Sequence, residues 1–244
     1  MGQRFFFNTL SLSIFLFSVN LSWAFEKCSG SPTKDVEVYS TWSNCLGNTL
    51  TSKGSYTGGV LGGMAQGFGI RIYAKSSAYT KYEGFWQGDK FHGKGTLTYS
   101  NGDTYEGAWL RGQKSGNGFL KYTNGDSYSG DWINDLPNGK GRYISLTGDK
   151  FVGDWLNGKK NGSGSYYSGK GGIFYKGQWQ NNLKSGYGIE FYPNGEKFTG
   201  NFVAGEKSNQ GIYTFLNGTS YSGEWKNGIY NGFGELKLLD GESY

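Results

Sequence analysis

The feature of this sequence that most constrains its fold is a repeat of about 23 residues that begins at Tyr56. Each unit opens with Tyr or Phe, followed by Gly two positions later, usually by Trp at four, and by Gly at eleven and thirteen. Units open at Tyr56, Tyr82, Tyr105, Tyr128, Phe151, Tyr175, Phe198 and Tyr221, and each takes the name of its opening residue. Tyr244 falls where a ninth would open. Such a period predicts an array of stacked units rather than one compact domain.

Alternation inside each unit predicts two β-strands. Tyr82, Gly84 and Trp86 share one face of the first strand, while Glu83 and Phe85 lie on the other. Residues 93–99 of the same unit alternate in the same way. Each unit is therefore predicted to be a β-hairpin with one face of aromatic residues and glycine and an opposite face that is mostly polar.

Asn-Gly steps between the units indicate how the hairpins are joined. Gly102, Gly125, Gly195 and Gly218 each stand third in a candidate three-residue loop, where the left-handed backbone conformation suits Gly. A two-residue turn would pair odd positions with even ones and split the aromatic residues between both faces. We therefore expect three-residue loops between units.

This register predicts which residues meet across strands. Each Trp is expected opposite the first Gly of the Gly-x-Gly pair on both flanking strands, each mid-strand Gly opposite the second, and Tyr105 between Leu97 and Leu120. Flat rings would then cover the glycine backbone. The predicted fold class is all-β: an elongated, right-twisted, single-sheet antiparallel meander of about eight hairpins, or some 16 strands.

Composition agrees with this architecture. The 244 residues include 44 Gly, 19 Tyr, 17 Phe and 8 Trp, which is unlike a compact core of Leu, Ile and Val. Stability is therefore expected to come from contacts between neighbouring units. The net charge of +5 is mildly basic, and we predict no nucleic-acid partner.

The units resemble the MORN repeat (membrane occupation and recognition nexus), whose pattern Tyr-x-Gly-x-Trp-x-x-Gly-x-x-x-Gly-x-Gly is met in the Tyr105 unit. The resemblance covers residues 56–244. Departures are Val60 for Trp, Gly88 one position early, Asp135 and Asn182 for the mid-unit Gly, Phe202 for Trp and Asn209 for Gly. These leave the local turn geometry open. The resemblance implies a scaffold or dimerising module that carries no cofactor.

The first 24 residues predict a secretory signal peptide. Arg4 precedes a Phe-rich apolar stretch, and Ser22 and Ala24 place small residues where a signal peptidase would cleave. The protein is therefore expected to be exported, to a periplasmic or extracellular location. The alternative is a membrane anchor formed by an uncleaved N-terminal segment.

Residues 25–55 are predicted to cap the leading edge of the array, with strand-like alternation over residues 36–39. Cys28 and Cys45 are the two cysteines of the chain, and a disulfide between them agrees with export. The alternative of free or metal-binding thiols lacks further ligands, because His92 is the one histidine and lies in a distant unit.

No catalytic or metal-binding arrangement is expected from these residues. A single histidine excludes a Ser-His-Asp, Cys-His or zinc site, and His92 is predicted to lie in a hairpin loop. Gly-Lys steps such as Gly93-Lys94 do not complete a phosphate-binding loop. Acidic residues recur with the repeat period, which indicates a solvated face. We therefore predict a protein that is not an enzyme.

Three functions remain open. The first is a scaffold whose aromatic and glycine groove binds a protein partner or a second copy of the chain as a homodimer. The candidate contacts are aromatic residues at the unit openers and Trp positions. They are Tyr82, Trp86, Tyr105, Trp109, Tyr128, Trp132, Trp155, Tyr175 and Trp179.

The second function is binding of an anionic membrane surface by basic residues along the hairpin loops. The candidate residues are Arg111, Lys114, Lys159, Lys160, Lys184 and Lys207. The third is binding of cell-wall glycan or choline by exposed aromatic residues, because tandem repeats of Trp, Tyr and Gly also build such modules.

Overall fold

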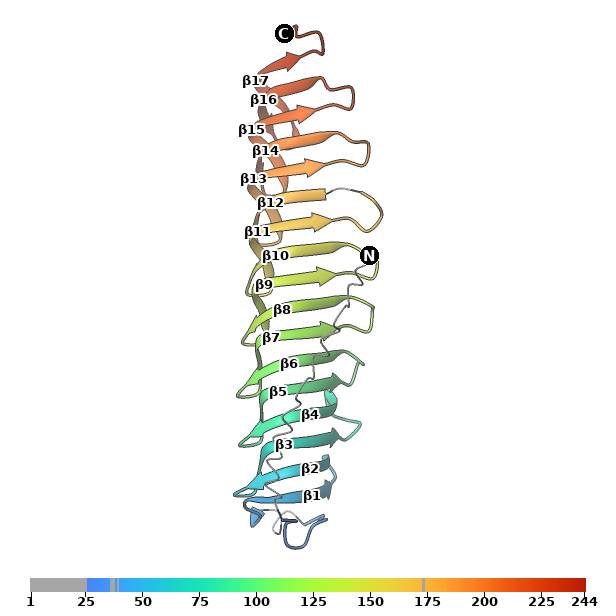
Figure 1. Ribbon diagram of the computed structural model, residues 1–244, viewed down its shortest axis with the longest axis vertical. Coiled ribbons are helices and arrows are strands. Elements are labelled where there is room, and N and C mark those ends of the chain that lie inside the picture. Colours follow the sequence, from blue (N-terminus) through green and yellow to red (C-terminus); the bar gives the residue numbers. More distant parts are fainter. Residues whose placement is uncertain (1–25, 36–37, 39, 173) are drawn as a thin grey trace, which may run out of the picture.

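The computed structural model describes residues 26–35, 38, 40–172 and 174–244. In these residues the chain forms one antiparallel sheet of 17 strands that is much longer than it is wide, with β1 and β17 at opposite ends (Figure 1). The prediction of an elongated all-β meander is confirmed. The predicted signal peptide, residues 1–24, lies outside the described residues.

Every strand pairs with its neighbours in sequence. The strands are β1 (Cys45–Thr51), β2 (Gly54–Leu61), β3 (Met64–Tyr73), β4 (Tyr79–Gln87), β5 (Lys90–Tyr99), β6 (Thr104–Leu110), β7 (Gln113–Lys121), β8 (Ser127–Ile133), β9 (Leu136–Ile144), β10 (Lys150–Leu156), β11 (Lys159–Tyr167), β12 (Phe174–Gln180), β13 (Leu183–Phe191), β14 (Lys197–Val203), β15 (Glu206–Thr214), β16 (Ser220–Lys226) and β17 (Ile229–Lys237). The described sheet has one strand more than the expected 16, because β1, ahead of the first unit, pairs with β2.

A column of glycines crosses the sheet, one from each strand. Gly107 of β6, for example, pairs with Gly95 on one side and with Gly118 on the other. Added Cβ atoms would collide: one on Gly107 would lie 2.6 Å from the Cα atom of Gly118, and one on Gly118 would lie 2.6 Å from a ring carbon of Tyr105. The opener ring therefore packs on bare backbone, as predicted, and the close approach requires Gly.

Three-residue loops join five of the seven pairs of consecutive units, including the four predicted ones, whereas the connections after Tyr73 and after Tyr167 are different. The N–H of Tyr99 donates to the carbonyl of Asp103, and the N–H of Gly102 donates to the carbonyl of Tyr99. Gly102 itself has φ 89°, in the left-handed region. These bonds define a type I turn followed by a left-handed residue, which keeps the aromatic side chains on one face.

Within each hairpin the predicted register is correct on one side of the Trp strand and wrong on the other. Trp109 lies opposite Gly93 of β5 as expected, but opposite Lys114 of β7 instead of Gly116. A β-bulge between Gly107 and Trp109 causes the shift. Gly116 lies in this bulge with φ 61°, so it is needed for its backbone conformation.

A two-residue turn closes each hairpin, and it explains the departures from the repeat pattern at Gly88, Asp135 and Asn182. Both turn residues have positive φ, as in Arg111 (52°) and Gly112 (90°). Asp135 and Asn182 take the second turn position with φ 67° and 75°, a conformation that Asp and Asn tolerate. Their Oδ1 atoms accept bonds from the N–H groups of Lys114 and Lys160 in the preceding unit.

The capping segment pairs with the outer edge of β1 through bridges from Lys27 to Leu46 and from Thr33 to Thr49. The Cys28–Cys45 disulfide is present, as predicted. Strand-like alternation at Val38 is wrong, because Val38 and Ser40 are helical; residues 36, 37 and 39 lie outside the described residues. No helix in the described part of the chain is long and apolar enough to cross a membrane.

Candidate interaction surface

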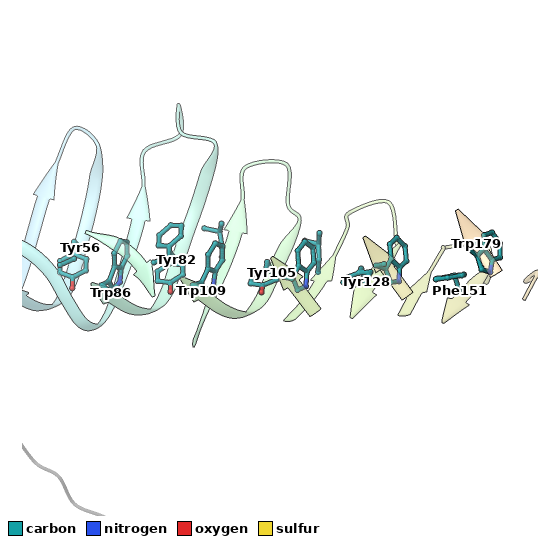
Figure 2. Close-up of a cluster of buried hydrophobic side chains, with 14 of the residues drawn as sticks. Tyr56, Tyr82, Trp86, Tyr105, Trp109, Tyr128, Phe151 and Trp179 are labelled. Atoms are coloured by element: carbon teal, nitrogen blue, oxygen red, sulfur yellow. The ribbon is translucent and has the colours of Figure 1, made fainter. Parts of the chain in front are cut away.

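One face of the sheet carries a continuous row of rings, and we call it the aromatic face. The Tyr105 ring meets the Trp109 indole of its own unit edge-on, with centroids 4.9 Å apart, and the Trp132 indole of the next unit at 5.3 Å. The same alternation of opener and Trp continues along the sheet (Figure 2). Such edge-to-face contacts bind each unit to the next.

Indole N–H groups add a second link between units. Nε1 of Trp109 donates to the carbonyl of Gly95 at 3.1 Å, and Nε1 of Trp132 donates to the carbonyl of Gly118 at 3.3 Å. Trp155 is different, because its Nε1 is buried and has no hydrogen-bond partner among the described residues.

The nine aromatic residues predicted to bind a partner lie together in this row, and all are buried. They range from 0% exposed for Tyr82, Tyr105 and Tyr175 to 9% for Trp155. These side chains hold the sheet together, so a partner on the aromatic face would meet mainly the residues that flank them.

The six predicted basic residues separate into two groups. Arg111 lies exposed in a hairpin turn and Lys159 lies exposed next to one, as expected. Lys114, Lys160, Lys184 and Lys207 do not line that edge: each stands nine residues after an opener and lies on the aromatic face. The β-bulge in each hairpin causes the difference, because it shifts the register so that the residue nine positions after the opener lies opposite the residue at the Trp position.

These four lysines pack their ammonium groups over rings from at least two adjacent units. Nζ of Lys160 lies 5.1 Å from the ring centre of Phe151, 5.4 Å from that of Tyr166 and 5.2 Å from that of Trp179 in the next unit. Lys207 lies 5.1 Å from Trp225 in the same arrangement. A cation over the electron-rich ring face is attracted electrostatically, so the lysines contribute to the stack.

Burial lowers the pKa values of Lys114, Lys160 and Lys207. None of the three forms an ion pair with a carboxylate in the described residues, whereas Lys184 pairs with Glu190, which is 4% exposed. Three half-buried ammonium groups on the aromatic face therefore retain N–H donors that could meet acceptors on another molecule.

A row of acidic residues borders the aromatic face and joins neighbouring units. Asp126 accepts a hydrogen bond from the Tyr143 hydroxyl at 2.7 Å, and Glu196 accepts one from the Tyr213 hydroxyl. These bonds lower the pKa values of both carboxyl groups. This row is not among the residues predicted from the sequence, although each acidic residue stands two positions before the opener of the next unit.

The last polar groups to consider are His92 and any side chains that could bind a metal ion. His92 lies in β5 opposite Phe85 and not in a hairpin loop, so that prediction is wrong; its Nδ1 is buried without a partner in the described residues. The β-bulge also causes this difference, because with the shifted register only two residues remain in the turn between β4 and β5, and His92 is paired within the strand. In the part of the chain that the structure describes, no cluster of His, Cys, Asp and Glu could hold a metal ion.

The segments of the chain that match a known family coincide with the strand pairs. The family described as MORN repeat matches residues 56–78, 82–104, 105–127, 128–150, 151–173, 175–197, 198–220 and 221–243. The chain belongs to the MORN-repeat family. These matched segments begin at the eight predicted openers, so the MORN repeat here is one hairpin followed by the connection to the next unit. A comparison with curated proteins found no match.

Solved structures with related folds are distant from this MORN array. The TCP10c domain of Drosophila melanogaster Sas-4 is 16% identical, with a TM-score of 0.37 over 62% of this chain and 90% of that chain. The wild-type TCP10 domain of Danio rerio CPAP, solved in complex with a STIL peptide, is 14% identical, with a TM-score of 0.28 over 73% of this chain and 93% of that chain. The similarity concerns fold alone and carries no functional argument.

Proposed function

We propose that the protein is an interaction scaffold whose aromatic face binds an acidic segment of a protein partner. The MORN repeat is a non-enzymatic repeat type, and eight copies make up most of this chain. The observation that carries the proposal is the set of half-buried ammonium groups of Lys114, Lys160 and Lys207, which face the same side without carboxylate partners in the described residues. Acidic side chains would complement them.

Two features favour an extended partner. The sheet offers one long row of equivalent sites, and Lys160, Lys184 and Lys207 follow one another in consecutive units. Successive units lie about two strand spacings apart, or roughly 10 Å, so an acidic residue every third position of an extended segment would meet them. A second copy of this chain is a less direct match, since its own aromatic face carries the same lysines.

The arrangement supports a protein partner over a membrane. Four of the six basic residues proposed for lipid binding project onto the aromatic face, and among these six only Arg111 and Lys159 lie exposed beside the turns. A flat bilayer that approached the turns would therefore meet less positive charge than the sequence suggested. Cell-wall binding by exposed aromatic residues is also less supported, because the repeated rings are buried.

We also propose that the scaffold acts outside the cytoplasm. The Cys28–Cys45 disulfide supports this location, because disulfides persist in oxidising compartments. A periplasmic or extracellular partner would follow. Fractionation of cells that express the full chain, with detection of the mature N-terminus, tests the location.

A charge-neutralising series tests the proposed surface. Lys114→Gln, Lys160→Gln and Lys207→Gln together remove three ammonium groups from the aromatic face, while Lys94→Gln, Lys121→Gln and Lys176→Gln remove three exposed ones from the opposite face. Binding of a fluorescent oligoglutamate peptide should weaken at least tenfold in the first triple variant and little in the control. Equal loss in both, or no binding by the wild type, would refute the surface.

A further inference from the structure

In the Tyr128 unit, the residue nine positions after the opener differs from the residues at that position in the other units. This position, opposite the Trp, holds Ala65, Phe91, Lys114, Pro137, Lys160, Lys184, Lys207 and Tyr230 in the eight units. The lysines reach across the opener ring and the next Trp, and Phe91 stacks on Tyr82 at 3.9 Å. Pro137 and Ala65 are too short to do either, but in the Tyr56 unit Arg71 lies over the rings of Tyr56 and Trp86. Among the described residues no cation lies over Tyr128 or Trp155.

The adjacent unit shows what normally fills this place. Nζ of Lys160 sits among the rings of Phe151, Tyr166 and Trp179, between 5.1 and 5.4 Å from each centre. The equivalent rings in the Tyr128 unit are Tyr128, Tyr143 and Trp155. All three walls of an ammonium-binding cage are therefore present, and no described residue places an ammonium group over them.

A hollow of about 550 Å³ marks the place. Its lining includes Tyr128, Tyr143, Trp155 and Pro137, with the tyrosine rings Tyr99 and Tyr122 further along. Trp155 is 9% exposed, more than the other five sheet tryptophans, whose values run from 2% to 7%. Among the described residues its Nε1 also has no partner, whereas each of those five indoles donates to a glycine carbonyl.

The charges around the hollow favour a cation. Asp103 and Asp135 line it, and the Asp126 carboxylate accepts a hydrogen bond from the hydroxyl of Tyr143. Lys114 lies at one end, over Trp132. Its ammonium does not exclude another cation, because Lys184 and Lys207 already occupy successive units of this same sheet.

We propose that the cage formed by Tyr128, Tyr143 and Trp155 binds an alkylammonium group supplied by another molecule. The attraction is the one that holds Lys160 in the next unit, and aromatic cages of this kind recognise quaternary ammonium ions. Two sources share this chemistry: a small quaternary ammonium compound such as choline, and the lysine side chain of a protein partner. Cation binding by the cage does not depend on acidic-peptide binding, although Lys114 lines the same hollow.

Nuclear magnetic resonance titration tests the cage in the full chain, with the Trp155 indole N–H signal as readout. Choline is compared with 3,3-dimethylbutan-1-ol, which has the same shape without charge. A lysine-containing peptide is compared with its norleucine analogue. Choline binding alone identifies a small ligand, and lysine-peptide binding identifies a partner side chain. If neither cation shifts the signal more than its neutral analogue, the cage proposal is wrong.

Two variants assign the binding to this cage. Pro137→Lys should fill it from within and weaken cation binding at least about tenfold, whereas Phe91→Lys, at the same position of another unit, should leave binding unchanged. Tyr143→Leu removes one wall and suits the fold, since Leu97 and Leu120 hold that position elsewhere. Tyr166→Leu is its control. Undiminished binding in both Pro137→Lys and Tyr143→Leu would overturn the assignment.

Discussion

The ammonium group of Lys114 lies 4.9 Å from the ring centre of Trp132, a residue of the following unit. The lysine thus acts as part of the stack between units, and its aliphatic stem takes the place that Phe91 fills in the Tyr82 unit. Charge and packing at this position contribute separately, and substitutions can distinguish them.

We expect Lys114→Met to change the free energy of unfolding by less than about 1 kcal/mol, because it keeps the apolar stem and also removes a desolvated charge. Lys114→Glu should cost about 2 kcal/mol more, since it places a carboxylate near Asp103 and Asp135 without the attraction to the rings. Urea denaturation measures both values. Equal stabilities would show that the ammonium group does not interact with the rings.

The two glycines of the Gly-x-Gly pair should respond differently to substitution. Gly118→Ala should destabilise the protein by about 2 kcal/mol or more, because its Cβ would overlap the Tyr105 ring. Gly116→Asn should cost less, since Asn209 occupies the equivalent bulge position with φ 58°. Thermal unfolding of the two variants checks the order, and the reverse order would contradict the assigned roles.

Replacing indole by phenyl should cost more at Trp132 than at Trp155. Trp132 loses a hydrogen bond to the Gly118 carbonyl, worth about 1 kcal/mol, whereas the Trp155 Nε1 has no partner to lose among the described residues. Phe202 shows that the fold accepts phenyl at this position, and it is 1% exposed. Urea denaturation of Trp132→Phe and Trp155→Phe compares them, and equal costs would contradict the geometry.

Stability should fall steeply above about pH 10. Burial raises the pKa of Tyr143 and of Tyr73 to about 12 in the folded protein, against about 10 in an unfolded chain. The contribution of these two tyrosines to the free energy of unfolding is complete below pH 10 and is lost as the pH rises through their pKa in the folded protein. The three lowered lysine pKa values act in the opposite direction, but more tyrosines are affected. Absorbance of tyrosinate, followed with circular dichroism against pH, should show ionisation coinciding with unfolding.

Reducing the disulfide should loosen the N-terminal end of the array. The bond joins residues 17 apart in sequence, and closing a loop of that size stabilises by about 3 kcal/mol. Cys28→Ser combined with Cys45→Ser should therefore speed hydrogen exchange in β1 and β2, while β13 to β15 remain protected because contacts are local. Uniform acceleration along the array would indicate a single cooperative unit.

Much of the fold could be predicted because the repeat encodes it locally. The opener, the Trp and the Gly-x-Gly pair recur with strand alternation, and the three-residue loops follow from Asn-Gly chemistry at Gly102 and its equivalents. The hairpin bulge was not predicted, since Gly116 at that spacing suits a regular strand as well as a left-handed kink. The misplaced lysines and His92 both follow from that bulge.

The sequence by itself determined the number of units, the antiparallel meander and the family, because each depends on contacts between residues close along the chain. Only the tertiary structure decided that the repeated aromatic rings are buried, that four lysines lie over them, and that among the described residues no cation lies over Tyr128 or Trp155. Those features arise because a β-bulge places the residue nine positions after each opener opposite the Trp of its own hairpin and near the Trp of the next unit. The alternation of residues in the sequence does not reveal this pairing.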